Sequence, residues 1–67
     1  MRNRIRVLRA ELKLTQAELA KTVDIARQSL NAIENERHDP SVTLAFAIAK
    51  ALGVSITEVF LTDGESG

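Results

Sequence analysis

The amino-acid sequence predicts a small all-α domain made of five short helices. Apolar residues recur at the three- and four-residue spacing of a helix face, and no β-branched run alternates as a half-buried strand would. Pro40, Gly53, Gly64 and Gly67 are the only proline and glycine residues, and none interrupts a periodic segment. A length of 67 residues allows one domain, close to the lower size limit for folding alone.

The first helix is predicted over residues 3–13. Asn3 is its expected N-cap, because a side-chain oxygen there can accept from the free N–H groups of the first turn. Ile5, Leu8 and Leu12 lie at helical spacing and form one apolar stripe, which we expect to face the core.

Two helices joined by a tight turn are predicted next, over residues 15–22 and 26–34. Thr15 and Glu18 have the spacing of a capping box, in which each side chain bonds the other residue's backbone N–H. Ala20 is small enough for the place where the two helices cross. The apolar contacts between the helices and their turn are expected from Leu19, Val23, Ile25, Leu30 and Ile33.

A fourth helix is predicted over residues 42–52, after a polar loop. Pro40 followed by Ser41 indicates a stop and then an N-cap, and Gly53 is a natural residue just past the end. A fifth helix then opens with a second capping box.

That second box is Ser55 with Glu58, and the helix carries Ile56, Val59 and Phe60. The domain is expected over residues 1–61, and residues 62–67 form a short polar tail.

The chain resembles the lambda-repressor/Cro-type helix-turn-helix family, the XRE family of DNA-binding regulators. The segments that carry the resemblance, in family order, are TQAELA (15–20), RQSLNAIE (27–34), DPSVTL (39–44) and AKALGVS (49–55). No single hexamer is decisive, but together the segments extend over almost the whole chain. The resemblance implies a lambda-repressor-like domain with its helix-turn-helix at the second and third helices.

The resemblance further implies that the helix over residues 26–34 enters the major groove. Arg27 and Gln28 occupy its first turn, where an Arg can bond guanine O6 and N7 and a Gln can pair with adenine. Asn31 and Ala32 lie one turn further on, and Ala32 can touch a thymine methyl. Base contacts are therefore expected from Arg27, Gln28, Asn31 and Ala32.

Phosphate contacts are implied around the same motif. Gln16 matches the family's Gln that touches phosphate and supports the side chain at Gln28. Asn35 and Arg37 match positions that approach phosphate, and Thr15 can face the backbone from the start of its helix. Phosphate contacts are therefore expected from Thr15, Gln16, Asn35 and Arg37.

The sequence departs from the family pattern at two positions. Asp24 stands where the family often has Gly, at a turn position that commonly needs positive φ. Ala26 stands where the family has a Ser or Thr cap, so the third helix either lacks a side-chain cap or uses Asp24. Glu34 is expected to be structural and to pair with a cation, because a carboxylate is repelled by phosphate.

The helix over residues 42–52 is apolar on nearly every side, which in a soluble protein indicates coverage on most sides. A chain of 67 residues has little material for that coverage. We therefore predict a symmetric homodimer whose interface includes Phe46, Val54, Ile56 and Phe60. A monomer with close packing between alanine residues is the alternative.

The formal net charge of zero hides a separation. Residues 1–30 hold seven Lys/Arg and three Asp/Glu, a net +4, whereas residues 31–67 hold two and six, a net −4. This division is expected to give a basic, DNA-facing half and an acidic distal half.

Other classes of function find little support. The chain has no cysteine, and its single histidine, His38, has no set of neighbouring ligands, so neither a metal site nor nucleophilic catalysis is predicted. No cofactor and no small-molecule ligand are expected, and the chain is not expected to be an enzyme. Without a long apolar run or a signal peptide, no membrane association is expected, and a cytoplasmic protein is predicted.

We therefore predict a sequence-specific regulator that binds duplex DNA, acting as a repressor on a near-palindromic operator. The alternative is a protein-interaction module, such as an antitoxin or an accessory regulator subunit, because the same scaffold permits both. An RNA or single-strand binder is disfavoured because the chain has no Trp or Tyr on which bases could stack.

Overall fold

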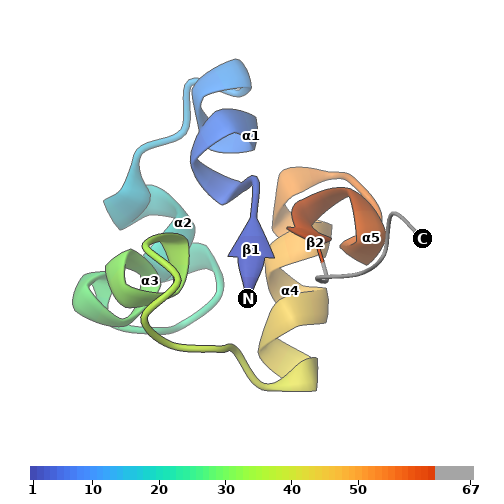
Figure 1. The fold of residues 1–67 in the computed structure, drawn as a ribbon. Helices are drawn as coiled ribbons and strands as arrows, with labels where there is room; N and C mark the ends of the chain where they lie inside the picture. The colour runs from blue at the N-terminus through green and yellow to red at the C-terminus, as the bar shows by residue number, and fades with distance from the viewer. Residues whose placement is uncertain (62–67) are drawn as a thin grey trace.

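A computed structural model describes residues 1–61 and confirms the lambda-repressor-like fold (Figure 1). The predicted polar tail, residues 62–67, lies outside the described residues. In chain order the elements are β1 (Arg2–Asn3), α1 (Ile5–Glu11), α2 (Gln16–Thr22), α3 (Arg27–Glu34), α4 (Val42–Leu52), α5 (Ile56–Val59) and β2 (Phe60–Leu61). The second, third and fourth helices match the predicted segments closely.

A short antiparallel sheet joins the two ends of the described chain and was not predicted. Asn3 pairs with Phe60 across the sheet, so the prediction of Asn3 as an N-cap and of Phe60 as a fifth-helix residue is wrong. Arg4 is the N-cap of α1, but the Asn3 side chain still accepts a hydrogen bond from the Ile5 N–H at 3.2 Å. Strands of two residues are too short to produce an alternating sequence pattern.

Both predicted capping boxes are present. The Thr15 hydroxyl accepts from the Glu18 N–H at 3.0 Å, and Oε1 of Glu18 accepts from the Thr15 N–H at 2.8 Å. At the start of α5, Oε1 of Glu58 accepts from the Ser55 N–H at 3.2 Å. These contacts fix where α2 and α5 begin.

The first four helices are each followed by a left-handed residue. These residues are Lys13, Asp24, Glu36 and Gly53. After α2, the N–H of Ile25 bonds to the Ala20 carbonyl at 3.0 Å and the N–H of Asp24 to the Lys21 carbonyl at 3.2 Å. The predicted roles of Gly53 and of positive φ at Asp24 (φ 60°) are confirmed.

The turn after α1 corrects the predicted end of that helix. Helix α1 ends at Glu11 and the chain reverses at Lys13, so the first helix is shorter than residues 3–13. Leu12 was expected in the apolar stripe, but it is 53% exposed because the helix no longer holds it on the inner face. Ile5 and Leu8 are buried as predicted.

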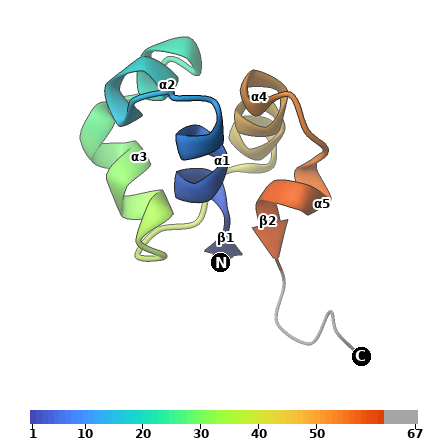
Figure 2. The same ribbon diagram turned by 90° about the horizontal axis from the view of Figure 1, so that it is seen from above.

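The core lies where α1 packs between the α2–α3 pair and α4 (Figure 2). Its fully buried side chains are Ile5, Leu19, Leu30, Ile33, Ile48 and Val59. Ala20, predicted at the helix crossing, is also buried, and the turn residues Val23 and Ile25 are half-buried against the same cluster. This core fixes α3 against α2 and leaves the outer face of α3 exposed.

Candidate nucleic-acid interface

The turn between α2 and α3 sets the direction in which α3 leaves the core. Asp24 adopts φ 60°, and Ala26 is extended and serves as the N-cap of α3. Ala26 offers no side-chain hydrogen bond to the helix, and Asp24 does not replace it within residues 1–61. The first turn of α3 therefore begins without a side-chain cap.

Five of the eight predicted DNA-contact residues line a single open hollow of about 500 Å³. These residues are Gln16, Arg27, Gln28, Asn31 and Arg37, and we call this surface the α3 hollow. Arg27, Gln28 and Arg37 are exposed, whereas Gln16 and Asn31 are half-buried. The α3 hollow thus gathers side chains from the start of α2, from α3 and from the loop after it.

The other three predicted DNA-contact residues are Thr15, Ala32 and Asn35. Thr15 caps α2. Ala32 is half-buried on α3, and Asn35 is exposed just past the end of α3. None of these three lines the hollow.

The side-chain oxygen of Asn31 accepts two hydrogen bonds. Its Oδ1 accepts from Nδ2 of Asn35 and from Nη2 of Arg37, each at 3.1 Å. Arg6 of α1 in turn donates to Oδ1 of Asn35 at 3.1 Å. The free group of Asn31 is consequently its amide N–H₂, a hydrogen-bond donor.

Below this surface lies the carboxylate of Glu34, whose side chain is 0% exposed. Arg9 of α1 donates to both of its oxygens, from Nε to Oε2 at 2.8 Å and from Nη2 to Oε1 at 3.1 Å. A third nitrogen of Arg9 donates to the Leu14 carbonyl at 3.0 Å. The prediction that Glu34 pairs with a cation is confirmed, and the pair ties α1 to the end of α3.

Gln16 lies between Glu34 and the surface. Its Nε2 donates to Oε1 of Glu34 at 3.2 Å, and its Oε1 accepts from Nε of Arg27 at 3.3 Å. We expected Gln16 to support Gln28, but within residues 1–61 its hydrogen bonds go to Glu34 and Arg27 instead. The reason is geometric, because Arg27 occupies the first position of α3 and its long side chain reaches back to the start of α2.

Sequence reasoning did not find the role of Arg9. We counted it as part of the basic, DNA-facing half, yet its side chain is only 14% exposed and its charge is matched by Glu34. A usable signal was present, because Arg9 lies four residues after the buried Ile5 and Glu34 four residues after the buried Leu30. Two opposite charges on two buried helix faces indicate a pair.

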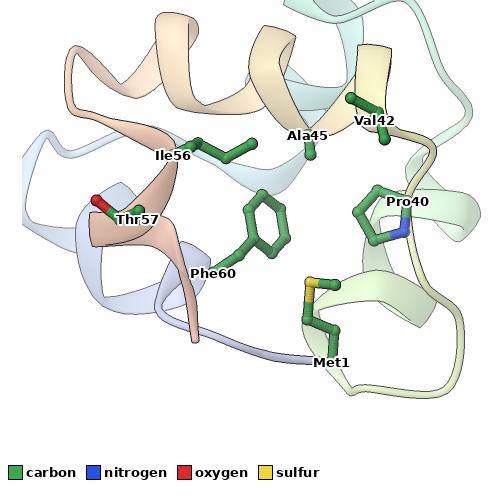
Figure 3. Close-up of a pocket in the computed structure, with 7 residues that line it drawn as sticks. All are labelled: Met1, Pro40, Val42, Ala45, Ile56, Thr57 and Phe60. Atoms are coloured by element: carbon green, nitrogen blue, oxygen red, sulfur yellow. The ribbon is translucent and has the colours of Figure 1, made fainter. Parts of the chain in front are cut away.

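A second surface feature lies beside α4 and is lined by other residues than the α3 hollow. An apolar pocket of about 250 Å³ is lined by residues that include Pro40, Val42, Ala45, Ile56 and Phe60 (Figure 3). Val42, which lines this pocket, and Phe46 lie one turn apart on α4 and are 73% and 56% exposed. We call these two residues the α4 face.

The predicted interface residues differ in exposure. Phe46 is exposed, Val54 and Ile56 are half-buried against the core, and Phe60 is only 8% exposed. Phe60 therefore contributes mainly to this chain's own core and to the wall of the pocket.

Within residues 1–61, no group of three or more His, Cys, Asp or Glu side chains is arranged to hold a metal ion. In the same part of the chain, no helix is long and apolar enough to cross a membrane.

The fold and the α3 hollow together define a helix-turn-helix domain of the DNA-binding kind. Residues 5–59 match a family model described as Helix-turn-helix. An uncharacterized HTH-type transcriptional regulator from Methanocaldococcus jannaschii is 43% identical over 65 residues, which cover 97% of this chain and 98% of that protein.

Two further proteins are similar. The immunity repressor protein of Bacillus phage phi105 is 39% identical over 56 residues, which cover 84% of this chain and 39% of the repressor. The crystal structure of the restriction-modification controller protein C.AhdI from Aeromonas hydrophila superposes with a TM-score of 0.79 at 28% identity, over 85% of this chain and 86% of that one. This chain belongs to the helix-turn-helix family of XRE type, and it is a transcriptional regulator with a DNA-binding fold.

Proposed function

We propose that this chain is a sequence-specific repressor that binds a near-palindromic duplex as a homodimer, with α3 in the major groove. The observation that carries the proposal is the α3 hollow. It gathers Arg27, Gln28 and Asn31, which were expected to contact bases, with Gln16 and Arg37, which were expected to contact phosphate. A surface built from such side chains suits the edge of a base pair flanked by its phosphates.

Base contacts are assigned to Arg27, Gln28, Asn31 and Ala32. The two terminal nitrogens of Arg27 form a fork that matches guanine O6 and N7, and the donor amide of Asn31 suits an acceptor on a base edge. Gln28 is exposed and lines the α3 hollow. Ala32, half-buried one turn further on, is assigned to a thymine methyl.

Phosphate contacts are assigned to Thr15, Gln16, Asn35 and Arg37. Arg37 is the cation of this group, and it lies just past the end of α3. Because few charges per subunit can neutralise phosphate, non-specific affinity should be modest, and its dependence on salt should be shallow, since the slope scales with the number of phosphates neutralised.

The α4 face supports the homodimer. Val42 and Phe46 expose apolar surface, and Val42 also lines the apolar pocket, a combination typical of surfaces that another chain covers. Two copies related by a two-fold axis would bring the two α4 faces together.

The helix dipoles favour an antiparallel arrangement of the two α4 helices, because side by side in that arrangement the dipoles oppose one another. Asp39, which precedes α4, is already paired with this chain's own N-terminal amine at 2.7 Å. Val54, Ile56 and Phe60 are assigned to the edge of this interface.

Selection of bound duplexes from a random DNA pool tests the proposal. We expect a palindromic consensus whose half-site centres are about 34 Å apart, the spacing of two recognition helices on one face of the duplex. Recovery of an asymmetric single site would contradict the dimer. Failure to enrich any sequence, with binding to a protein partner instead, would favour the interaction module. A reporter placed behind the selected site then separates repression from activation.

A further inference from the structure

A chain of three side chains leads from the core of the molecule to the α3 hollow. It begins at Glu34, whose carboxylate is fully buried and held by Arg9. It continues through Gln16, which bonds Glu34 at 3.2 Å, and ends at Arg27, which bonds Gln16 at 3.3 Å. Of the three, Arg27 is exposed at the surface.

The carboxylate of Glu34 determines which way the Gln16 side-chain amide is oriented. An ionised carboxylate only accepts hydrogen bonds, so the Gln16 amide must turn its N–H₂ toward Glu34. The carbonyl oxygen of the same amide then faces outward, toward α3. Arg27 carries only donors, and it meets the acceptor that Gln16 presents.

The bond to Gln16 uses one particular part of the Arg27 side chain. The donor is Nε, on the inner edge of the guanidinium group. Within residues 1–61, no protein hydrogen bond is found for the two terminal nitrogens of Arg27. The group is thus held by its inner nitrogen while its outer fork, the part that matches guanine, stays available.

We infer that Glu34 is a positioning residue for base recognition, and that it acts through Gln16 to hold Arg27 in the orientation that reads guanine. The inference rests on the proposed function, since it names how the base-reading side chain is set. The benefit is preorganisation: a long side chain that is already ordered loses less freedom on binding. Removal of the carboxylate should therefore weaken the preference for guanine although Glu34 never touches DNA.

The test needs a variant that removes the carboxylate without leaving Arg9 buried and unpaired. The double substitution Arg9→Met with Glu34→Leu serves, because a buried ion pair can be replaced by apolar residues of similar size with little loss of stability. Gln16→Ala is the second variant, which breaks the relay at its middle and leaves the Arg9–Glu34 pair intact. Cooperative unfolding of each variant is checked before binding is measured.

The first readout is the preference for guanine at the base pair where Arg27→Ala relaxes selectivity. We expect Arg9→Met/Glu34→Leu to lower the ratio of guanine to adenine affinity by about two- to tenfold, the effect of immobilising one long side chain. In the Arg27→Ala background the same double substitution should change the ratio no further. An unchanged ratio in the double variant, or an equal reduction with and without Arg27, overturns the inference.

The second readout requires no DNA. The Arg27 Nε–H is followed by ¹⁵N NMR relaxation in the free protein, with Arg37 as an internal comparison. Arg27 should be ordered in the original chain and should become mobile in both relay variants, whereas Arg37 should not change. Equal mobility of Arg27 in all three proteins overturns the inference. Because this result is independent of DNA binding, failure of the relay is distinguished from failure of the proposed function.

Discussion

The α3 hollow and the α4 face are both exposed, but their side chains are held in different ways. In the hollow, Arg27 is tied through Gln16 to the buried Glu34, and Asn31 is held by Arg37 and Asn35. On the α4 face, Val42 and Phe46 expose apolar surface. The α3 hollow is therefore arranged in advance for directional hydrogen bonds, whereas the α4 face offers apolar area that any complementary apolar surface can cover.

The largest effect is expected from breaking the anchor beneath the α3 hollow. Glu34→Ala leaves the Arg9 guanidinium buried without its partner, which typically costs about 3–5 kcal/mol. A domain of this size has a total stability of only about 3–10 kcal/mol, so the substitution should remove a large part of the free energy of unfolding and lower the urea midpoint strongly. Urea unfolding measures this, with Arg9→Met/Glu34→Leu as the matched control. If Glu34→Ala is as stable as the control, the buried pair does not anchor α1 to α3.

On the other surface, Phe46→Ser should leave the fold intact and weaken self-association. An aromatic residue at the centre of an interface is often a hot spot, so a loss of at least about tenfold in dimer affinity is expected. Sedimentation at several protein concentrations measures the loss. The control is Val7→Ser, which removes a similarly exposed apolar residue, 49% exposed, from α1. If the original chain sediments only as a 7.3 kDa species at micromolar concentration, the α4 face does not join two copies.

Smaller effects on stability are expected at the left-handed residues that follow α2 and α4. Asp24 follows α2 and Gly53 follows α4, and both have positive φ. Gly53→Ala should destabilise by about 1 kcal/mol, because a Cβ meets no atom within 4 Å and the cost is backbone strain alone. Asp24→Gly should stabilise by under about 1 kcal/mol.

Thermal unfolding of the two variants checks both signs. A lower midpoint for Asp24→Gly would contradict the turn geometry between α2 and α3. The two substitutions should shift the midpoint in opposite directions. Both turns have positive φ, but one substitution introduces glycine there and the other removes it.

The smallest effect concerns the cap of α2, at the edge of the hollow. The backbone N–H of Thr15, and then its hydroxyl, hold the pKa of Glu18 below the ordinary value of 4.5. Because the folded state has the lower pKa, the ionised carboxylate stabilises the fold above that value, and this contribution is lost as pH falls through the lowered pKa. Urea midpoints between about pH 6 and pH 3 should therefore fall slightly more steeply for the original chain than for Glu18→Gln. Parallel curves would contradict an ionised cap.

Much of the fold could be predicted from the sequence because its signals are local. Capping boxes at Thr15 and Ser55, the glycine after α4 and the helical spacing of apolar residues each lie within a few positions of the element they define. The β1–β2 pairing could not be predicted, since it joins Asn3 to Phe60 across most of the chain in strands too short to show a period.

In the candidate site, too, local features could be predicted and long-range contacts could not. Which residues face the α3 hollow follows from the motif, and five of the eight expected side chains line it. How they are held does not follow, because the partners come from three helices. Gln16 was expected beside Gln28, but the buried Glu34 and the long reach of Arg27 determine its actual contacts.

The central claim is that Arg27 in the α3 hollow reads a base, and a comparison of two arginines tests it most directly. Affinities of Arg27→Ala and Arg37→Ala are measured on the selected operator and on its single-base variants at fixed salt. Arg27→Ala should cost about 1–3 kcal/mol and relax preference at one position of the half-site, whereas Arg37→Ala should weaken all sequences alike and reduce the salt dependence. Equal loss on every sequence for both substitutions would contradict the account.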